Sequence, residues 1–97
     1  MRPTLDIESV LADLPGWSRA EGDRPAIARS FRFSDFNSAW GWMSQAALLA
    51  EKLDHHPEWS NVYGRVDVLL TTHDAGGVTE LDVTMAGFMD GMAARLS

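Results

Sequence analysis

Three histidines, His55, His56 and His73, lie close together in the sequence, at the ends of predicted elements and beside loops. Imidazole suits acid–base chemistry near neutral pH, because the unperturbed pKa of histidine is about 6.5. Loops held by rigid elements are also where catalytic and binding groups concentrate. We therefore predict that the three histidines form the proton-transferring centre of a small enzyme. The competing interpretation is that they are ordinary surface residues.

The predicted elements point the three rings in different directions. If the strand expected over residues 65–72 continues straight, His73 lies on the side opposite its apolar positions and points away from the core. His55 and His56 are adjacent, so in an extended segment their side chains point to opposite sides. We expect the two to do different jobs, unless both simply decorate a helix C-terminus, where the helix dipole favours histidine.

Two carboxylates are placed to tune these histidines. Glu51 lies one helical turn before His55, so we expect the two side chains to share a face and form a hydrogen bond. Such a carboxylate raises the basicity of the ring and fixes its tautomer. Asp54 is a second candidate for the same role. The alternative for either acid is a solvated surface charge.

Other chemistries are poorly supported by the motifs. The histidines and the nearby Asp74 and Asp82 invite a zinc interpretation, but no usual metal-ligand spacing is present, so we predict no metal site. The chain has no cysteine, which excludes disulfides and thiolate nucleophiles. No serine has the glycines of a nucleophile elbow, and Gly76-Gly77 lacks the Lys-Ser/Thr of a phosphate loop. We expect no cofactor.

Composition narrows the class of protein further. The chain has 97 residues, of which 45% are hydrophobic and 23% charged, a globular balance that predicts one domain over residues 1–97. A formal net charge of −6 with scattered basic residues argues against nucleic-acid binding. No signal peptide or membrane-spanning run is recognisable, so we expect no membrane association and a cytoplasmic location.

Apolar periodicity and turn residues predict three helices and four strands. We expect helices over residues 4–14, 35–52 and from 79 onward, and strands over 17–20, 26–33, 61–63 and 65–72. Thr4 and Ser34 are the expected N-caps of the first two helices. Pro57 should end the second helix by forcing His56 out of the helical region. This order predicts an α+β fold with a four-stranded antiparallel sheet and three helices packed on one face.

The second and third helices carry further information. The second is apolar on more than one face, which indicates burial on two sides, one of them against a neighbouring subunit. The third should begin at Thr79, with Asp82 at its third position and a hydrophobic staple between Val78 and Val83. We expect its buried stripe to be Leu81, Met85, Phe88, Met92 and Leu96.

One pattern resembles a known family. Glu51-x-x-x-His55-His56-Pro57, five residues to Tyr63, nine to His73 and eight to Asp82 is similar to the signature of the pterin-4a-carbinolamine dehydratases. The likeness covers nearly the whole chain, since it extends to Gly16-Trp17, Phe31-x-Phe33, Asp35-Phe36-Asn37 and Phe88-Met89.

The resemblance implies an activity and an assembly. It implies loss of water from a 4a-hydroxytetrahydropterin to give the quinonoid dihydropterin, which recycles the pterin used by aromatic amino-acid hydroxylases. It also implies an α+β domain assembled as a dimer or a dimer of dimers, with an aromatic amino-acid hydroxylase as a further partner. Some animal relatives bind a transcription factor, so the alternative is a non-catalytic dimerisation or regulatory module.

The resemblance also implies roles for individual residues. His56 and His73 would be the acid and base, with His55 orienting or assisting. The implied substrate-binding residues are Glu51, Asp54, Pro57, Trp17 and Asp82, of which Trp17 would stack on the pterin. This chain departs from the animal members, which have an arginine just before the aspartate that matches Asp82, where this chain has Leu81. The departure puts substrate affinity in doubt more than proton transfer.

Overall fold

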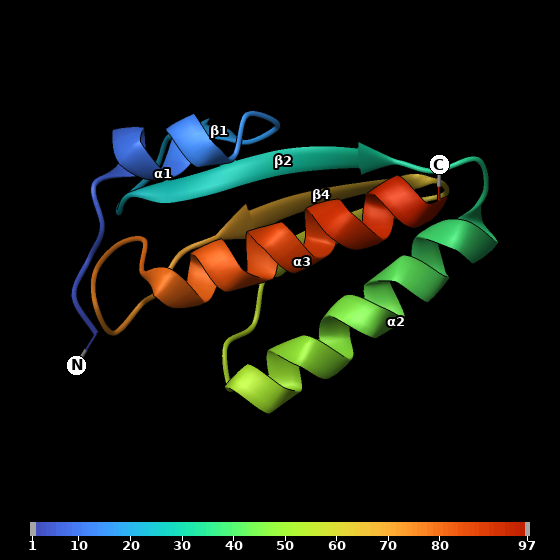
Figure 1. Cartoon of the computed structure of the whole chain (residues 1–97). Helices are drawn as coiled ribbons and strands as arrows, with labels where there is room; N and C mark the ends of the chain where they lie inside the picture. Colours follow the sequence, from blue (N-terminus) through green and yellow to red (C-terminus); the bar gives the residue numbers. More distant parts are fainter. Residues whose placement is uncertain (1, 97) are drawn as a thin grey trace.

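The computed structural model describes residues 2–96, which form a four-stranded sheet covered by three helices (Figure 1). The elements in chain order are α1 (Ile7–Asp13), β1 (Ser18–Ala20), β2 (Ala26–Arg32), α2 (Phe36–Leu53), β3 (Glu58–Val62), β4 (Arg65–Leu70) and α3 (Glu80–Leu96). The sheet has the strand order β1-β2-β4-β3, and every neighbouring pair is antiparallel. The predicted α+β architecture is confirmed.

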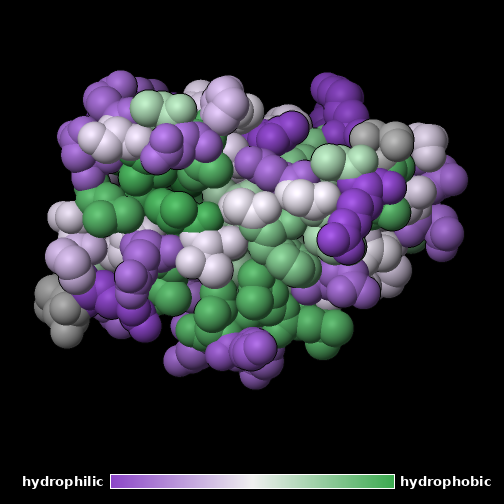
Figure 2. Space-filling view, viewed as in Figure 1, coloured by the Kyte–Doolittle hydropathy of each residue, from purple (hydrophilic) through white to green (hydrophobic). Residues whose placement is uncertain are grey.

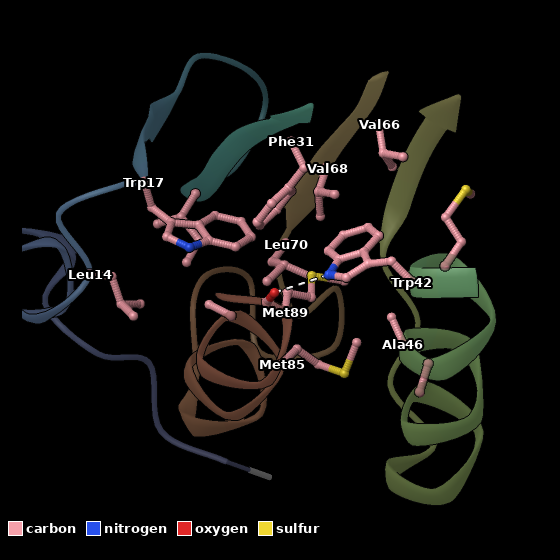
Figure 3. Close-up of a cluster of buried hydrophobic side chains, with 14 of the residues drawn as sticks. Leu14, Trp17, Phe31, Trp42, Ala46, Val66, Val68, Leu70, Met85 and Met89 are labelled. Atoms are coloured by element: carbon pink, nitrogen blue, oxygen red, sulfur yellow. Dashed lines mark hydrogen bonds between the residues drawn. The ribbon is translucent and has the colours of Figure 1, made fainter. Parts of the chain in front are cut away.

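The core lies between the sheet and the helices. Alternate residues of β4 are buried, and β2 contributes Ile27 and Phe31 to the same face. From α2, the fully buried Trp42 packs its ring 4.6 Å from Phe31 and donates its indole N–H to the carbonyl of Met89 in α3, at 3.0 Å (Figure 3). Because one side chain touches the sheet and both long helices, it fixes how α2 and α3 lie on the sheet.

Arg29 explains why the alternation of β2 is imperfect in the sequence. It has the same parity as Ile27 and Phe31 and therefore points to the helix-covered face. Its guanidinium lies 4.5 Å from the centre of the Phe31 ring and forms an ion pair with Asp90 of α3 at 2.8 Å. A charged residue at an inward position is thus accommodated by a partner from the opposite layer.

Both predicted N-caps were wrong by one or two residues. Asp6, rather than Thr4, caps α1 by accepting from the backbone N–H of Ser9. Asp35, rather than Ser34, caps α2 by accepting from the backbone N–H of Ser38 at 2.7 Å. In each case a carboxylate three residues before a free N–H gives the cap a charge as well as an acceptor, which the helix N-terminus favours.

Two strand boundaries and the buried face of α3 also differ from the prediction. β3 begins at Glu58 instead of residue 61, because its first residue already pairs with Leu69 of β4. β4 ends at Leu70 instead of residue 72. The buried residues of α3 are Asp82, Met85, Ala86 and Met89. Of the predicted stripe, Met85 is buried and Met92 packs partly buried against the core.

The topology brings several chain segments to one end of the sheet. β2 and β3 begin where β4 ends, since Ile27 pairs with Leu70 and Glu58 pairs with Leu69. The C-terminus of α2 and the N-terminus of α3 lie at this same end, at the left of Figure 1. Within residues 2–96, no helix is both long and apolar enough to cross a membrane.

The Asp35 cap predicts a pH-dependent contribution to stability. Hydrogen bonds from the backbone and side chain of Ser38 lower the pKa of the Asp35 carboxyl below its ordinary value of 3.8. A lowered folded-state pKa stabilises the fold above the unfolded value, and that contribution is lost as the pH falls through the folded value. We expect Asp35→Ala to lower the melting temperature at neutral pH, and the difference to shrink below pH 3.8.

Melting curves followed by circular dichroism at several pH values test this expectation. Asp23→Ala is the matched control, because Asp23 is an exposed acid in the β1–β2 loop with no hydrogen bond to any residue the structure describes. A difference for Asp35→Ala that stays constant from neutral to acidic pH would contradict a charged cap.

Candidate active site

A cavity of about 840 Å³ lies at the end of the sheet where these segments meet. It is lined by Arg2, Asp54, His55, His56, Thr71, Thr72, His73, Asp74, Ala75 and Leu81. The three histidines lie 18 residues apart along the chain at most, but they come from the end of α2 and from the loop after β4. The structure thus brings together all three predicted catalytic residues.

His55 is the buried histidine of the three. Only 8% of its side chain is exposed, against 58% for His56 and 65% for His73. Its Nε2 lies 2.5 Å from Oδ1 of Asp82, which is fully buried. Since an ionised carboxylate only accepts, this contact places a proton on Nε2 and leaves Nδ1 as the nitrogen that can gain or lose one.

Asp82 is held by a network around the first turn of α3. Its Oδ2 accepts from the backbone N–H of Thr79 at 2.9 Å and from the hydroxyl of Thr72 at 2.8 Å. Because the single Thr72 proton is used there, the Thr79 hydroxyl must donate to Thr72 across their 2.8 Å contact. The predicted capping role of Asp82 is confirmed, and its second oxygen is left for His55.

The end of α2 sets the direction of the His-His pair. Asp54 adopts a left-handed conformation with φ 51° and ψ 45°, and the backbone N–H of His55 donates to the carbonyl of Ala50. This is a Schellman-type ending, and aspartate is one of the few non-glycine residues that tolerate the conformation. The helix therefore ends at Leu53 with Asp54 as its C-cap, and the prediction that Pro57 ends it through His56 is wrong.

This chain reversal gives Glu51 a different histidine partner from the predicted one. Glu51 was predicted to hydrogen-bond with His55, which is wrong: its Oε1 lies 3.0 Å from Nε2 of His56. The left-handed turn carries His55 to the buried side, toward Asp82, and returns His56 toward the last turn of α2. The Asp54 carboxylate hydrogen-bonds with neither histidine in the described part of the chain, although Asp54 lines the cavity.

His73 approaches the cavity from the loop after β4 and is exposed, as its predicted direction away from the core requires. Its Nε2 lies 3.0 Å from Oε2 of Glu58 and 2.6 Å from Nη2 of Arg24. Glu58 is the first residue of β3, and Arg24 belongs to the loop between β1 and β2. Neither residue was predicted as part of the site.

Trp17 does not lie at this cavity. Only 4% of it is exposed, and its ring packs edge-on against Phe31 (Figure 3). Its indole N–H donates to Asp90 at 2.9 Å. The same Asp90 oxygen accepts from Arg29. Burial in the core is incompatible with the stacking role expected of Trp17, because both ring faces are covered by protein.

Leu81 and Arg2 share a wall of the cavity. Leu81 is half-buried and lines the cavity beside the histidines, while Arg2 forms an ion pair with Glu80 in the first turn of α3. The segment before α1 is attached there by the backbone N–H of Leu5, which donates to the carbonyl of Val78. Because Glu80 directly precedes Leu81, Arg2 places a cation close to Leu81. Pro57 follows the His-His pair and is half-buried outside the lining.

The arrangement suits proton transfer. Two exposed imidazoles, each beside a carboxylate, face a cavity that also contains a buried imidazole fixed by Asp82. No group of three or more metal-ligating side chains gathers anywhere in residues 2–96. The imidazoles and carboxylates at this cavity are groups that can donate and accept protons.

The residues that sequence analysis missed reach the site in two ways. Arg24 and Glu58 come beside His73 because β2 and β3 pair with β4, and no spacing in the sequence reports that pairing. Thr72 precedes His73 in the chain, and its hydrogen bond to Asp82 depends on how α3 lies beside the end of β4. Glu58 could have been found in part from the sequence. If the third strand had been predicted to begin three residues earlier, Glu58 would have been placed beside the end of β4.

A comparison with known families decides the identity of the chain. The family model described as pterin 4 alpha carbinolamine dehydratase matches residues 3–92, which include the histidines, Glu51 and Asp82. The chain belongs to this family. The resemblance carried by the His-His-Pro segment is confirmed.

Relatives of high identity support the assignment to the dehydratase family. Proteins from Bordetella avium (strain 197N) and Rhodopseudomonas palustris (strain BisB18), both named "Putative pterin-4-alpha-carbinolamine dehydratase", are 60% and 61% identical to this chain. The alignments cover 94% and 95% of this chain, and 83% and 90% of the relatives.

Solved structures of the dehydratase family have the same fold. A transcriptional coactivator/pterin dehydratase from Brucella melitensis is 55% identical, with a TM-score of 0.88 over 93% of this chain and 98% of that one. A pterin dehydratase-like protein identified as a RuBisCO assembly factor in the alpha-carboxysome shares the fold at 20% identity and a TM-score of 0.66, covering 80% and 92% of the two chains.

The dehydratase-family site predicts a strong dependence of stability on Asp82. Asp82→Ala removes the partner of His55, of the Thr72 hydroxyl and of the Thr79 N–H, all in a buried setting. We expect it to lower the free energy of unfolding by about 3–5 kcal/mol, the range for breaking a buried pair. Urea unfolding followed by tryptophan fluorescence measures the change.

Asp82→Asn is the matched control, because it keeps the shape of the side chain and removes its charge. Its amide oxygen still accepts from the Thr79 N–H, so we expect a smaller loss of stability than for Asp82→Ala. Equal stability of the wild type and Asp82→Ala would show that the network does not support the fold.

Proposed function

We propose that the protein is a hydro-lyase that removes water from a 4a-hydroxytetrahydropterin to give the quinonoid dihydropterin. The observation that carries the proposal is the cavity in which three histidines meet, in a chain of the pterin-4a-carbinolamine dehydratase family. Recycling of the pterin used by aromatic amino-acid hydroxylases belongs to the same proposal, and so does a working contact with such a hydroxylase.

The reaction needs one acid and one base. The C4a–O bond breaks with its electron pair going to oxygen, and an acid protonates that oxygen so that water leaves. A base takes the N5 proton, and the N–H bonding electrons form the new C4a=N5 double bond. Protons and electrons balance without a redox partner, so imidazoles tuned by carboxylates are a sufficient set of groups.

We assign the acid and base to His56 and His73, because their rings are exposed to the cavity and each is paired with a carboxylate. His55 is buried on Asp82 and is assigned an orienting role. Glu51 hydrogen-bonds with His56 and favours its protonated form. Asp54 forms the turn that directs His55 and His56 to different sides, and Asp82 fixes the tautomer of His55. Arg2 and Leu81 form the wall on which the pterin rests.

The assay follows formation of the quinonoid product from 4a-hydroxytetrahydropterin by absorbance. We expect the wild type to exceed the uncatalysed rate, and His56→Ala combined with His73→Ala to lower kcat by about 10²–10⁴-fold, the usual contribution of acid–base groups. Arg32→Ala, an exposed change at the far end of β2, is the control and should keep wild-type activity. A wild-type rate equal to background, or a double variant with full activity, would refute the assignment.

We further propose that the protein is a homo-oligomer assembled through α2. Phe36 and Trp40 stack at 6.1 Å and are 51% and 55% exposed, and Leu48 is 69% exposed on the same helix. Figure 2 shows hydrophobic surface over the lower end of α2. Large exposed apolar side chains gathered on one helix favour a protein partner over open solvent.

The coactivator half of the Brucella melitensis protein's name favours a second candidate function, a regulatory dimerisation module. The two functions separate by their dependence on the histidines. A regulatory role through α2 would survive replacement of all three histidines, whereas the dehydratase would not.

Light scattering after size exclusion tests the α2 interface. We expect a mass of at least twice 10.7 kDa for the wild type and a monomer for Leu48→Glu, because a buried charge opposes association. Thr84→Glu places the same charge on an exposed position of α3 and should leave the mass unchanged. A monomeric wild type at micromolar concentration would contradict the proposed interface.

A further inference from the structure

Nε2 of His73 has two partners with opposite requirements. Nη2 of Arg24 lies 2.6 Å from this nitrogen, and Oε2 of Glu58 lies 3.0 Å from it. A guanidinium can only donate a hydrogen bond and a carboxylate can only accept one. A ring nitrogen carries either a lone pair or a proton, so it can satisfy Arg24 or Glu58 but never both at once.

The two partners are held independently of His73. Glu58 is the first residue of β3, and it points to the face of the sheet without helices because its neighbour Trp59 packs toward Trp42 in the core. Arg24 lies in the β1–β2 loop, where its guanidinium is 3.5 Å from Glu58. Since this ion pair does not include the ring, only the hydrogen bond to His73 has to change partner when the ring changes state.

Arg24 carries a donor that is unfavourable for the fold. Its Nε–H is buried and finds no hydrogen-bond partner in the described part of the chain, and only 31% of the side chain is exposed. A buried donor without a partner is unfavourable, so its presence requires a reason. The contact with His73 supplies one.

The remaining charges around His73 are in the cavity. Asp74 follows it in the chain, and Asp54, His56 and Arg2 line other walls. Among the described residues, only Arg24 and Glu58 hydrogen-bond with its ring. They are therefore the groups with the strongest control over its charge.

We infer that Arg24 and Glu58 are positioning residues that select the protonation state of His73. Arg24 stabilises the neutral ring by donating to the lone pair of Nε2, and Glu58 stabilises the protonated ring by accepting from Nε2–H. The relevance to turnover rests on the proposed dehydratase function, in which His73 alternates between the two states once per cycle. When the exchanged proton is the one on Nε2, its exchange is accompanied by a change of hydrogen-bond partner.

NMR titration of the histidine rings in the free protein tests the inference without an activity assay. The His73 signals are assigned by their loss in His73→Asn. We expect the pH of half-protonation to rise by about 0.5–1 unit in Arg24→Gln, which loses a nearby cation, and to fall by a similar amount in Glu58→Gln. Arg19→Gln removes an exposed arginine that pairs with Glu8 and should not change the midpoint.

One further variant and a fallback keep the outcome decisive. Arg24→Lys retains the charge, so its midpoint should remain within about 0.3 unit of the wild type while Arg24→Gln moves. If Arg24→Gln does not fold, as judged by circular dichroism, the opposite shift of Glu58→Gln still decides. Shifts in the same direction for both neutral variants, or no shift in either, would overturn the inference.

Enzyme kinetics separate this inference from the proposed function. In the pH profile of kcat/KM, the limb assigned to His73 should shift to higher pH in Arg24→Gln and to lower pH in Glu58→Gln. Loss of a purely structural contact would lower kcat without shifting this limb. An inactive wild type with the expected NMR shifts would refute the dehydratase and leave the His73 assignment standing. An active wild type with unmoved midpoints would refute the His73 assignment alone.

Discussion

The buried carboxylate of Asp82 is the interaction on which the site depends. It accepts from Thr79 just before α3 and from Thr72 just after β4, and it binds His55 just after α2, so its three partners come from three different segments of the chain. A fully buried carboxylate is costly unless all its oxygens are satisfied, so the three donors must be in place together. The end of α2, the end of β4 and the start of α3 are therefore located relative to one another by a single side chain.

Antiparallel pairing does the rest of the positioning. A strand that ends beside the starts of two others brings three loops to one edge, and the two long helices add a C-terminus and an N-terminus there. The result is a cavity whose walls come from separate parts of the sequence, as the lining residues show. Sites at such junctions gain rigidity from every element that meets there.

Features that depend on local spacing were predictable from the sequence. The Thr79–Asp82 cap and the alternation of β4 follow from neighbouring residues, and both are confirmed. The partner of Glu51 was wrong, because one left-handed residue at Asp54 exchanges the directions of His55 and His56, and aspartate adopts that conformation only in some contexts. Arg24 and Glu58 were out of reach for a different reason, since strand register decides what lies beside His73.

The exposure of His56 and His73 affects how their protonation states would be restored after each turnover. A proton acceptor enclosed by protein must return its proton through the fold, which requires an ordered relay or an opening motion. Rings that are 58% and 65% exposed exchange protons with buffer ions directly, so each can be reset between turnovers without its neighbour. Under the proposed chemistry the surrounding solution is the proton reservoir, and the rigid end of the sheet has no need to move.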